Sequence, residues 1–174
     1  MGPSDSGLND IFTTGLVMDP AQPQTLYVAT NGRGIYRTTD GGASWRPLPA
    51  GLDQLPAQAI AVAPSDTATL YAASEGGVDV SRDGGAIWQD VTEGLTNPRA
   101  EAIAVHPDDA RIAFAGTQRP DGAYYRTANA GASWTPANGG QGTNAVGTAL
   151  VFDPQNPLTI YAARDPDGLT GCPS

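Results

Sequence analysis

The sequence contains no lysine, so all nine of its basic residues are arginines. Aspartate and glutamate together number 18, which gives a formal net charge of −9 and a pI near 4.2. No basic cluster is present that would neutralise the phosphates of a nucleic acid or of an anionic membrane surface. We therefore expect no nucleic-acid partner and no membrane insertion, and we attribute the acidic surface to solubility.

Cysteine and histidine are almost absent as well. Cys172 is the single cysteine and His106 the single histidine, so neither an intrachain disulfide nor a cluster of zinc-binding cysteines can form. His106 lies at a predicted strand end, where we expect a turn residue and not a catalytic base. No run of about 18 apolar residues is present for a membrane span, and phosphate-binding loops and dinucleotide fingerprints are missing. We expect no cofactor and no metal.

Glycine (22 residues) and proline (15 residues) are abundant, whereas only 16% of the residues are charged. No segment shows helical periodicity. Hydrophobic residues make up 40% of the chain, which is too large a share for a disordered segment. This combination is typical of short β-strands joined by tight turns, and 174 residues suffice for one domain with a sizeable core.

One glycine-rich turn occurs three times, each time just before a tryptophan: RTTDGGASW at 37–45, VSRDGGAIW at 80–88 and RTANAGASW at 126–134. The three tryptophans are 43 and 46 residues apart, and a similar spacing separates Pro20, Pro64, Pro107 and Pro154. A period of about 40–50 residues with strand signals is typical of a β-propeller, in which each repeat forms a blade of four antiparallel strands. We therefore predict an all-β propeller.

Alignment of the repeats predicts the strands of each blade. The first strand ends at the repeated proline and is apolar on both faces, as an inner strand between two sheets would be, in 15–20, 59–64, 102–107 and 149–154. The second strand is expected at 25–30, 69–74, 111–116 and 159–164, and the third at 34–38, 77–81 and 124–127. The fourth begins at each tryptophan, which we expect to cover the outer part of its own blade.

The chain is predicted to be a single propeller segment of about three and a half blades. Blade boundaries are expected at about 9–52, 53–95 and 96–141, with a partial fourth blade at 142–174. The Gly-Leu dipeptide that closes two of the blades recurs at Gly7–Leu8, so Met1–Leu8 is interpreted as the tail of a preceding blade. Because an open arc exposes apolar blade faces, we expect either a homo-oligomer that closes the propeller or the remainder of a longer chain.

The repeated turn resembles the Asp-box, or BNR repeat, whose pattern is Ser/Thr-x-Asp-x-Gly-x-Ser/Thr-Trp. Ile87 replaces Ser/Thr in the second copy, and Asn129 replaces Asp in the third. The resemblance implies a propeller similar to those of sialidases, xyloglucanases and sortilin-like receptors, with a structural box that lies away from the ligand site. It also favours an extracellular or periplasmic location. The box positions are Thr38, Asp40, Gly42, Ser44, Trp45, Ser81, Asp83, Gly85, Trp88, Thr127, Asn129, Gly131, Ser133 and Trp134.

The same resemblance places a ligand site on the blade edge opposite the boxes. That edge carries the loops between the second and third strands and the connections between blades. Each polar residue there can also be an ordinary solvated loop charge. The candidate ligand-face residues are Arg33, Glu75, Arg99, Glu101, Arg119, Asp121, Arg164 and Asp165.

Two functions remain open on these residues. The first is a non-catalytic propeller that binds a protein, peptide or glycan through its loop face. The second is a fragment of a propeller glycoside hydrolase, similar to xyloglucanases or sialidases, that acts on a polysaccharide or glycan. A glycosidase needs two carboxylates at a set separation across the sugar bond, and spacing singles out no pair among Glu75, Glu101, Asp121 and Asp165. We therefore favour the binding function and assign no catalytic residue.

Overall fold

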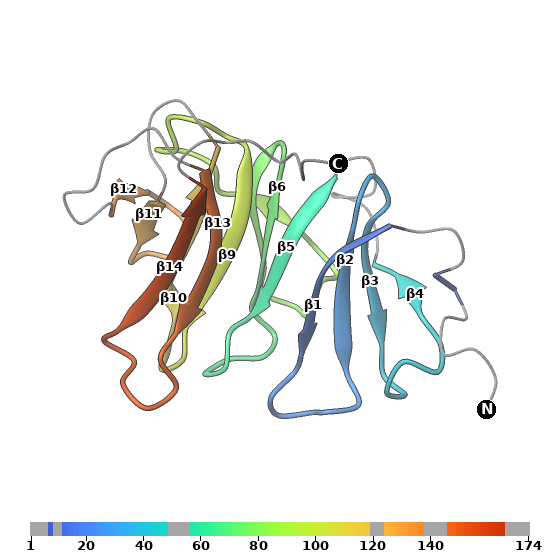
Figure 1. The fold of residues 1–174 in the computed structure, drawn as a ribbon. Coiled ribbons are helices and arrows are strands. Elements are labelled where there is room, and N and C mark those ends of the chain that lie inside the picture. The colour runs from blue at the N-terminus through green and yellow to red at the C-terminus, as the bar shows by residue number, and fades with distance from the viewer. Residues whose placement is uncertain (1–6, 9–11, 49–55, 119–123, 138–145, 166–174) are drawn as a thin grey trace, which may run out of the picture.

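The computed structural model describes residues 7–8, 12–48, 56–118, 124–137 and 146–165, and in these ranges the chain forms strands and turns (Figure 1). Sheet 1 contains β1 (Thr13–Met18), β2 (Leu26–Thr30), β3 (Gly34–Thr38) and β4 (Arg46–Pro47). Sheet 2 contains β5 (Ala57–Val62), β6 (Leu70–Ser74), β7 (Gly77–Ser81) and β8 (Gln89–Asp90). Sheet 3 contains β9 (Ala100–His106), β10 (Asp109–Thr117), β11 (Tyr124–Thr127) and β12 (Thr135–Pro136). Sheet 4 contains β13 (Val146–Phe152) and β14 (Ile160–Asp165).

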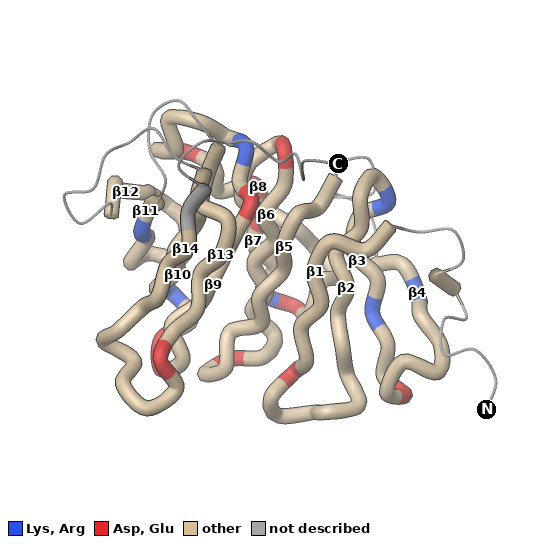
Figure 2. The backbone as a smooth tube through the Cα atoms, in the orientation of Figure 1, with Lys and Arg blue, Asp and Glu red and all other residues tan. Residues whose placement is uncertain are grey.

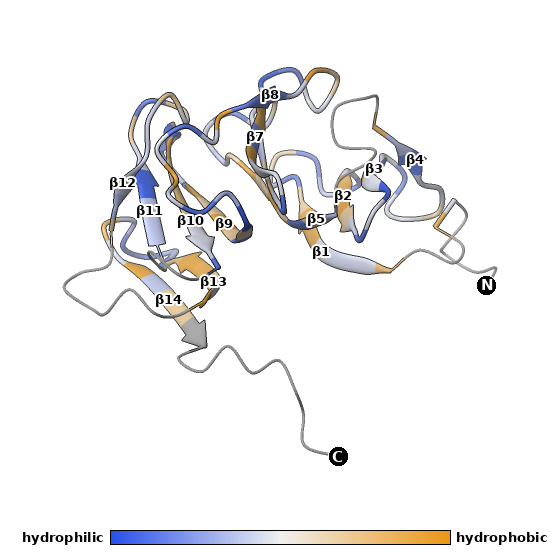
Figure 3. Cartoon of the chain, turned by 90° about the horizontal axis from the view of Figure 1, so that it is seen from above, coloured by the Kyte–Doolittle hydropathy of each residue, from blue (hydrophilic) through white to orange (hydrophobic). Residues whose placement is uncertain are grey.

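Every sheet is antiparallel, and each strand pairs only with its neighbours in the sequence. The predicted all-β fold of three four-stranded units and a two-stranded fourth is therefore confirmed. Seen from above, the sheets are arranged as an arc (Figure 3). The first strands β1, β5, β9 and β13 lie along its inner side, and the short fourth strands lie at its outer side. No helix long and apolar enough to cross a membrane occurs in the ranges given above.

Two details of the strands differ from the sequence prediction. The fourth strands contain only two residues each and begin one residue after the tryptophan. In sheet 3, Phe114 is paired with Ala104 in the way that Tyr27 is paired with Val17 and Tyr71 with Ala61. The sequence alignment placed Ala113 at the position of Tyr27 and Tyr71, whereas the structure places Phe114 there, one residue later. The β9–β10 pairing shifts register between Asp109 and Ala113, which accounts for the difference.

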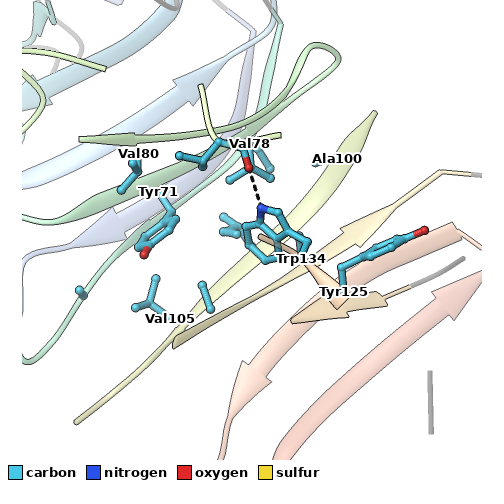
Figure 4. Packing of buried hydrophobic residues seen from close by; sticks show 13 residues of the cluster. Tyr71, Val78, Val80, Ala100, Val105, Tyr125 and Trp134 are labelled. Carbon is cyan, nitrogen blue, oxygen red and sulfur yellow. Dashed lines mark hydrogen bonds between the residues drawn. The ribbon is translucent and has the colours of Figure 1, made fainter. Parts of the chain in front are cut away.

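The core lies between the sheets. Between sheets 1 and 2, aliphatic and tyrosine side chains of β2 and β3 pack against those of β5 and β6, namely Tyr27, Ala29, Ile35, Ile60, Val62, Leu70 and Ala72. Between sheets 2 and 3 the same positions recur as Tyr71, Ala73, Val78, Val80, Ile103, Val105, Ala113 and Ala115 (Figure 4). Full burial of one large apolar side chain stabilises the fold by about 1.5–3 kcal/mol, so packing between the sheets contributes strongly to the stability of the arc.

The tryptophan of the third box lies in the seam between its own sheet and the preceding one. Trp134 is 4% exposed and packs in the cluster between sheets 2 and 3. Its indole Nε1 donates a hydrogen bond of 2.6 Å to the carbonyl oxygen of Val91 in the preceding sheet (Figure 4). Trp88 is partly buried and packs against the cluster between sheets 1 and 2, as does Leu48, the counterpart of Val91. The sequence predicted that the tryptophan covers the outer part of its own blade; the structure shows that Trp134 also packs against the preceding blade.

The Gly-Leu dipeptides take part in the same seams. Gly94, with φ +98°, lies so close to Trp134 that a Cβ there would be 2.9 Å from the Trp134 carbonyl oxygen. Gly7, with φ +102°, lies against the carbonyl oxygen of Trp45 in the corresponding way. Gly7–Leu8 thus occupies, relative to sheet 1, the position that Gly94–Leu95 occupies relative to sheet 3, which agrees with its interpretation as a blade tail.

Both ends of the arc present apolar faces to solvent. On sheet 1, Leu16 is 64% and Met18 51% exposed. On sheet 4, Val151 is 59% and Tyr161 57% exposed. Tyr161 is paired with Val151 as the buried Tyr71 is paired with the partly buried Ala61, so these positions correspond to buried or partly buried positions of the inner seams. The end faces therefore have the composition of seam surfaces without a neighbouring sheet.

Candidate functional site

The two edges of the arc are built differently. On one edge, which we call the box edge, each hairpin between the third and fourth strands is hydrogen-bonded to the backbone at or just before the start of the second strand of its own sheet. The backbone N–H groups of Gly41, Gly84 and Ala130 donate 2.9 Å hydrogen bonds to the carbonyl oxygens of Gln24, Ala68 and Arg111, respectively. The other edge, which we call the loop edge, carries the β2–β3 and β6–β7 loops and residues 96–99 ahead of β9 (Figure 1).

The three box hairpins share one hydrogen-bond pattern. In the first, the Thr38 hydroxyl donates to Asp40 Oδ1 (2.6 Å) and accepts the N–H of Gly42 (3.1 Å), while Asp40 Oδ1 accepts the N–H of Ser44 (2.9 Å). The Ser44 hydroxyl donates to Asp40 Oδ2 (2.6 Å). These hydrogen bonds all lie within the hairpin, so the side chains of the first box stabilise the turn itself.

The other two boxes adapt the pattern to their substitutions. In the second, Ser81 and Asp83 repeat the contacts, and Asp83 Oδ1 accepts the backbone N–H of Ile87 (2.9 Å). In the third, Asn129 Oδ1 accepts the N–H of Ser133 (3.0 Å), and its amide Nδ2 donates to the Ser133 hydroxyl (2.9 Å). Asparagine therefore replaces aspartate without loss of the turn, because only the direction of one hydrogen bond changes.

Hydrogen bonds keep the box carboxylates ionised. Donation from Ser44, together with Thr38, lowers the pKa of Asp40 to about 2. The backbone N–H of Ile87 and the Ser81 hydroxyl lower the pKa of Asp83. Because both oxygens of Asp40 and Oδ1 of Asp83 already accept hydrogen bonds within their hairpins, these three oxygens offer little to a ligand. No group of three or more His, Cys, Asp or Glu side chains suited to a metal ion is found among the residues that the structure describes.

The loop edge brings together three of the predicted ligand-face residues. Arg99 forms an ion pair with Glu75 across sheets 2 and 3, with 2.6 Å between Arg99 Nη2 and Glu75 Oε1. Glu101 lies in β9, and its carboxylate accepts a hydrogen bond from the Gln118 side-chain amide. Burial raises the pKa of Glu101 above its usual value, while Gln118 and the Arg99 charge oppose this rise. We call Glu75, Arg99, Glu101 and Gln118 the loop-edge cluster.

Backbone contacts fix the cluster on the sheet. The Gln118 N–H donates to the Arg99 carbonyl oxygen (2.9 Å), and the Asn97 amide donates to the Gln118 carbonyl oxygen (2.9 Å). Figure 2 shows acidic and basic positions side by side at this edge of sheets 2 and 3. The ion pair remains open to solvent, with side-chain exposures of 47% for Arg99 and 43% for Glu75. The cluster is thus rigidly based yet accessible.

The remaining candidates are placed elsewhere. Arg33 lies exposed in the β2–β3 loop of sheet 1 and has no described contact with the loop-edge cluster. Arg119 and Asp121 lie outside the described residues. Arg164 and Asp165 end β14, and their side chains also lie outside the described part. Sequence reasoning missed Gln118, although it directly follows the buried Thr117 at the end of a strand, where side chains reach the loop edge.

His106 has the contacts of a packing residue. It is the last residue of β9, and its ring lies edge-to-face against Phe152 of sheet 4, with centroids 5.2 Å apart. Its Nδ1 accepts the backbone N–H of Asp108 at 3.1 Å. Phe114 makes a second edge-to-face contact with Phe152 at 5.8 Å. The single histidine therefore connects sheets 3 and 4 at a turn.

Sequence reasoning also missed a pair of carboxylates on sheet 2. Asp79 of β7 is directly opposite Asp90 of β8, and opposed like charges destabilise a sheet. Burial and, to a smaller extent, the Asp90 charge raise the pKa of Asp79 to about 6. The strand pattern did not indicate the carboxylate pair. The position of Asp79 is occupied by tyrosine in β3 and β11, so the other repeats give no sign of a charged residue there.

Replacement of Asp79 with asparagine is expected to stabilise the protein by about 1 kcal/mol at neutral pH. The pKa of Asp79 is higher in the folded state than in the unfolded chain. Its favourable protonated form is therefore fully present below the unfolded pKa and is lost as the pH rises through about 6. Solvent screening keeps the gain below the full value of the shift.

Urea denaturation of the wild type and Asp79→Asn at about pH 4 and about pH 8 measures this effect, since the difference arises from a proton bound only in the folded state. Asp90→Asn is the matched control, and we expect it to give a smaller gain. A stability difference that does not change between the two pH values would contradict the prediction.

No protein-family model and no curated protein matches the chain. Solved structures do match. The GH74 xyloglucanase from Xanthomonas campestris is similar over 88% of this chain and 27% of its own, with a TM-score of 0.69 and 18% identity. YCF48 bound to D1 peptide is similar over 83% of this chain and 45% of its own, with a TM-score of 0.62 and 18% identity.

An auxiliary nutrient binding protein from Bacteroides thetaiotaomicron is similar over 88% of this chain and 36% of its own, with a TM-score of 0.67 and 14% identity. The chain is a segment of a β-propeller. Sheets 1 to 3 are its four-stranded blades, and sheet 4 is the inner half of another blade. The propeller segment spans less than half the length of each of these three chains, and at these identities the likeness shows the fold alone.

Proposed function

We propose that this propeller segment is a non-catalytic binding scaffold that takes a protein, peptide or glycan ligand at its loop edge. The observation that carries the proposal is the loop-edge cluster, in which Glu75, Arg99 and Glu101 from two blades lie together on a rigid base. Charged side chains that rigid strands hold at an accessible loop edge are typical of binding sites. The peptide-bound and nutrient-binding neighbours support a binding function for the fold, not a particular ligand.

The box hairpins have a supporting role in this proposal. We assign them to the Asp-box repeat on the strength of their sequence pattern and their shared hydrogen bonds. They lie on the edge opposite the loop-edge cluster, and their polar groups are directed at their own backbone. Their function is to close each blade, so that the loop edge remains the surface for a ligand.

A binding experiment tests the proposal. The probes are xyloglucan oligosaccharides and short acidic or basic peptides, measured by isothermal titration calorimetry. We expect at least one probe to bind saturably and Arg99→Ala to weaken it by about tenfold or more, as the loss of a charged hydrogen-bonding anchor does. Arg111→Ala is the matched control, because Arg111 forms an exposed 2.8 Å ion pair with Asp109 on the box edge. Equal weakening by both variants, or no binding of any probe, would contradict the proposal.

A second candidate function is that of a glycoside hydrolase fragment. The raised pKa of Glu101 favours it, because a general acid must hold its proton, and Glu75 supplies a second carboxylate close to the same arginine. A reducing-sugar assay on xyloglucan separates the two functions. Turnover that Glu101→Gln abolishes would establish hydrolysis, whereas binding without turnover supports the scaffold.

The end faces suggest protein partners as well. The exposed Leu16 and Met18 on sheet 1, and Val151 and Tyr161 on sheet 4, match seam positions, so we propose that further blades cover them. These blades come from a second copy or from additional polypeptide. Light scattering over a range of concentrations distinguishes the two sources, because a ring of copies that Leu16→Asp disrupts supports self-assembly. A monomer at every concentration would rule self-assembly out.

A further inference from the structure

Two arginines lie side by side on the outer strands of sheet 1. Arg37 of β3 is directly opposite Arg46 of β4, so both side chains are on the same face of the sheet. Figure 2 shows this pair as the adjacent basic positions on β3 and β4. Like charges at directly opposed positions repel each other and destabilise a sheet. An anion held between the two guanidiniums would remove this repulsion.

Within the described residues, no carboxylate is paired with either guanidinium. Arg37 Nε is buried and has no hydrogen-bond partner. Neither guanidinium takes part in an ion pair within the described ranges, where the pairs are Arg99–Glu75 and Arg111–Asp109. The Arg37 guanidinium carbon lies 5.6 Å from the centroid of the Tyr27 ring, which steadies the charge but accepts no N–H in the plane of the guanidinium. Buried donors without an acceptor are uncommon in native proteins.

The arginines share a cavity of about 350 Å³. The cavity is also lined by Thr39, Asp40 and Ser44 of the first box. Both oxygens of Asp40 accept hydrogen bonds from the hairpin itself, from Thr38 and from Ser44, so this carboxylate is committed to the turn. The cavity is therefore lined by two arginines and Thr39, and one of the arginine donors, Arg37 Nε, has no hydrogen-bond partner.

We propose that Arg37 and Arg46 form a binding site for a small oxyanion, either a carboxylate or a free sulfate or phosphate ion. A guanidinium presents paired N–H donors in a plane, which matches two oxygens of one oxyanion. Two opposed guanidiniums hold the same anion between them, and the anion removes their mutual repulsion. The site lies on the box side of blade 1 and is independent of the loop-edge cluster.

The other blades provide an internal comparison. In sheet 2, the corresponding opposed pair is Val80 and Gln89. In sheet 3 it is Arg126 and Thr135, with the Arg126 guanidinium 6.0 Å from the centroid of the Phe114 ring. Blade 3 thus repeats the arginine over an aromatic ring but lacks the second arginine. Blade 1 alone among these three carries the full pair, so Arg126 serves as the matched control.

Titration with sodium phosphate and with sodium sulfate at constant ionic strength tests the site. The readout is the ¹H–¹⁵N resonance of the Arg37 side-chain Nε–H, which reports on the buried donor directly. We expect a saturable shift at millimolar concentration, and in Arg46→Gln an affinity that is lower by about tenfold or more. Arg46 is exposed, so this variant is expected to fold, and Arg46→Lys provides a second variant that keeps the charge but loses the paired donors.

Further titrations distinguish the sources of the anion. Saturable binding of acetate and of a short glutamate-rich peptide, tighter than that of phosphate, would assign the site to a carboxylate partner. Tighter phosphate or sulfate binding would assign it to a free ion. An Arg37 resonance that none of these probes shifts would overturn the proposal, as would a shift that persists unchanged in Arg46→Gln or that Arg126→Gln weakens equally.

Discussion

Replacement of Trp134 with alanine is expected to lower the free energy of unfolding by about 3–5 kcal/mol, the range for removal of a large buried aromatic side chain. Trp134 is 4% exposed and lies in the largest seam cluster, between sheets 2 and 3. The substitution also leaves the Val91 carbonyl oxygen without its indole donor. Chemical denaturation measures the loss. Backbone circular dichroism is the signal, because the variant lacks one of the tryptophans on which fluorescence would depend.

Two variants show where this energy resides. Trp45 holds the same box position in blade 1 but is only partly buried, and within the described residues no sheet precedes its own. Trp45→Ala is therefore expected to cost less than half as much. Trp134→Phe keeps most of the apolar surface and removes the hydrogen bond, which is worth about 1 kcal/mol. Equal losses from Trp45→Ala and Trp134→Ala would mean that the tryptophan acts within its own hairpin and not across the seam.

Replacement of Gly131 with alanine is expected to destabilise the protein by about 2–4 kcal/mol, because backbone strain and overpacking add. Gly131 has a φ of +86°, a backbone conformation that residues other than glycine rarely adopt. A Cβ at this position would lie 2.6 Å from both Val91 Cβ and Val91 Cγ2 in the neighbouring sheet. Since the Val91 side chain is branched at Cβ and stiff, the two sheets would have to separate to admit it.

A control separates these two causes. Gly84 has a φ of +72° in the second box, and nothing lies within 4 Å of a Cβ built there. Gly84→Ala should therefore lower the free energy of unfolding only through backbone strain, by about 1 kcal/mol. Denaturation of Gly131→Ala in a Val91→Ala background should recover part of the loss, as a double-mutant cycle. Similar losses at Gly131 and Gly84, with no recovery, would contradict the role of the seam.

The hairpins could be predicted from the sequence because their contacts are local. Thr38, Asp40 and Ser44 lie within seven residues, so the local amino-acid sequence specifies which groups meet in the turn. The same holds for the asparagine variant in the third box, where Asn129 makes the corresponding contacts. Pairing of neighbouring strands is also local, and the repeat period alone indicated four strands in each blade. Phe114 was misplaced by one residue because a register shift leaves no mark on the alternation of side chains.

The candidate sites were less accessible to such reasoning. The loops of Glu75, Arg99 and Glu101 were predicted to share an edge, but nothing in their spacing indicated the ion pair or the contact with Gln118. Arg37 and Arg46 were not singled out at all, since they flank a box whose hydrogen bonds were the stronger signal. Both sites depend on which strands lie opposite each other, and on which blades lie side by side.

By itself, the sequence determined the repeat, the hairpins and the four-stranded blade, because each of these follows from contacts between residues close together in the chain. The tertiary structure alone decided what happens between blades. It placed Trp134 against Val91, brought Arg99 to Glu75, and raised the pKa of Asp79 by burial. The physical reason is that a period of two identifies the two faces of a strand but not the neighbour that each face will meet.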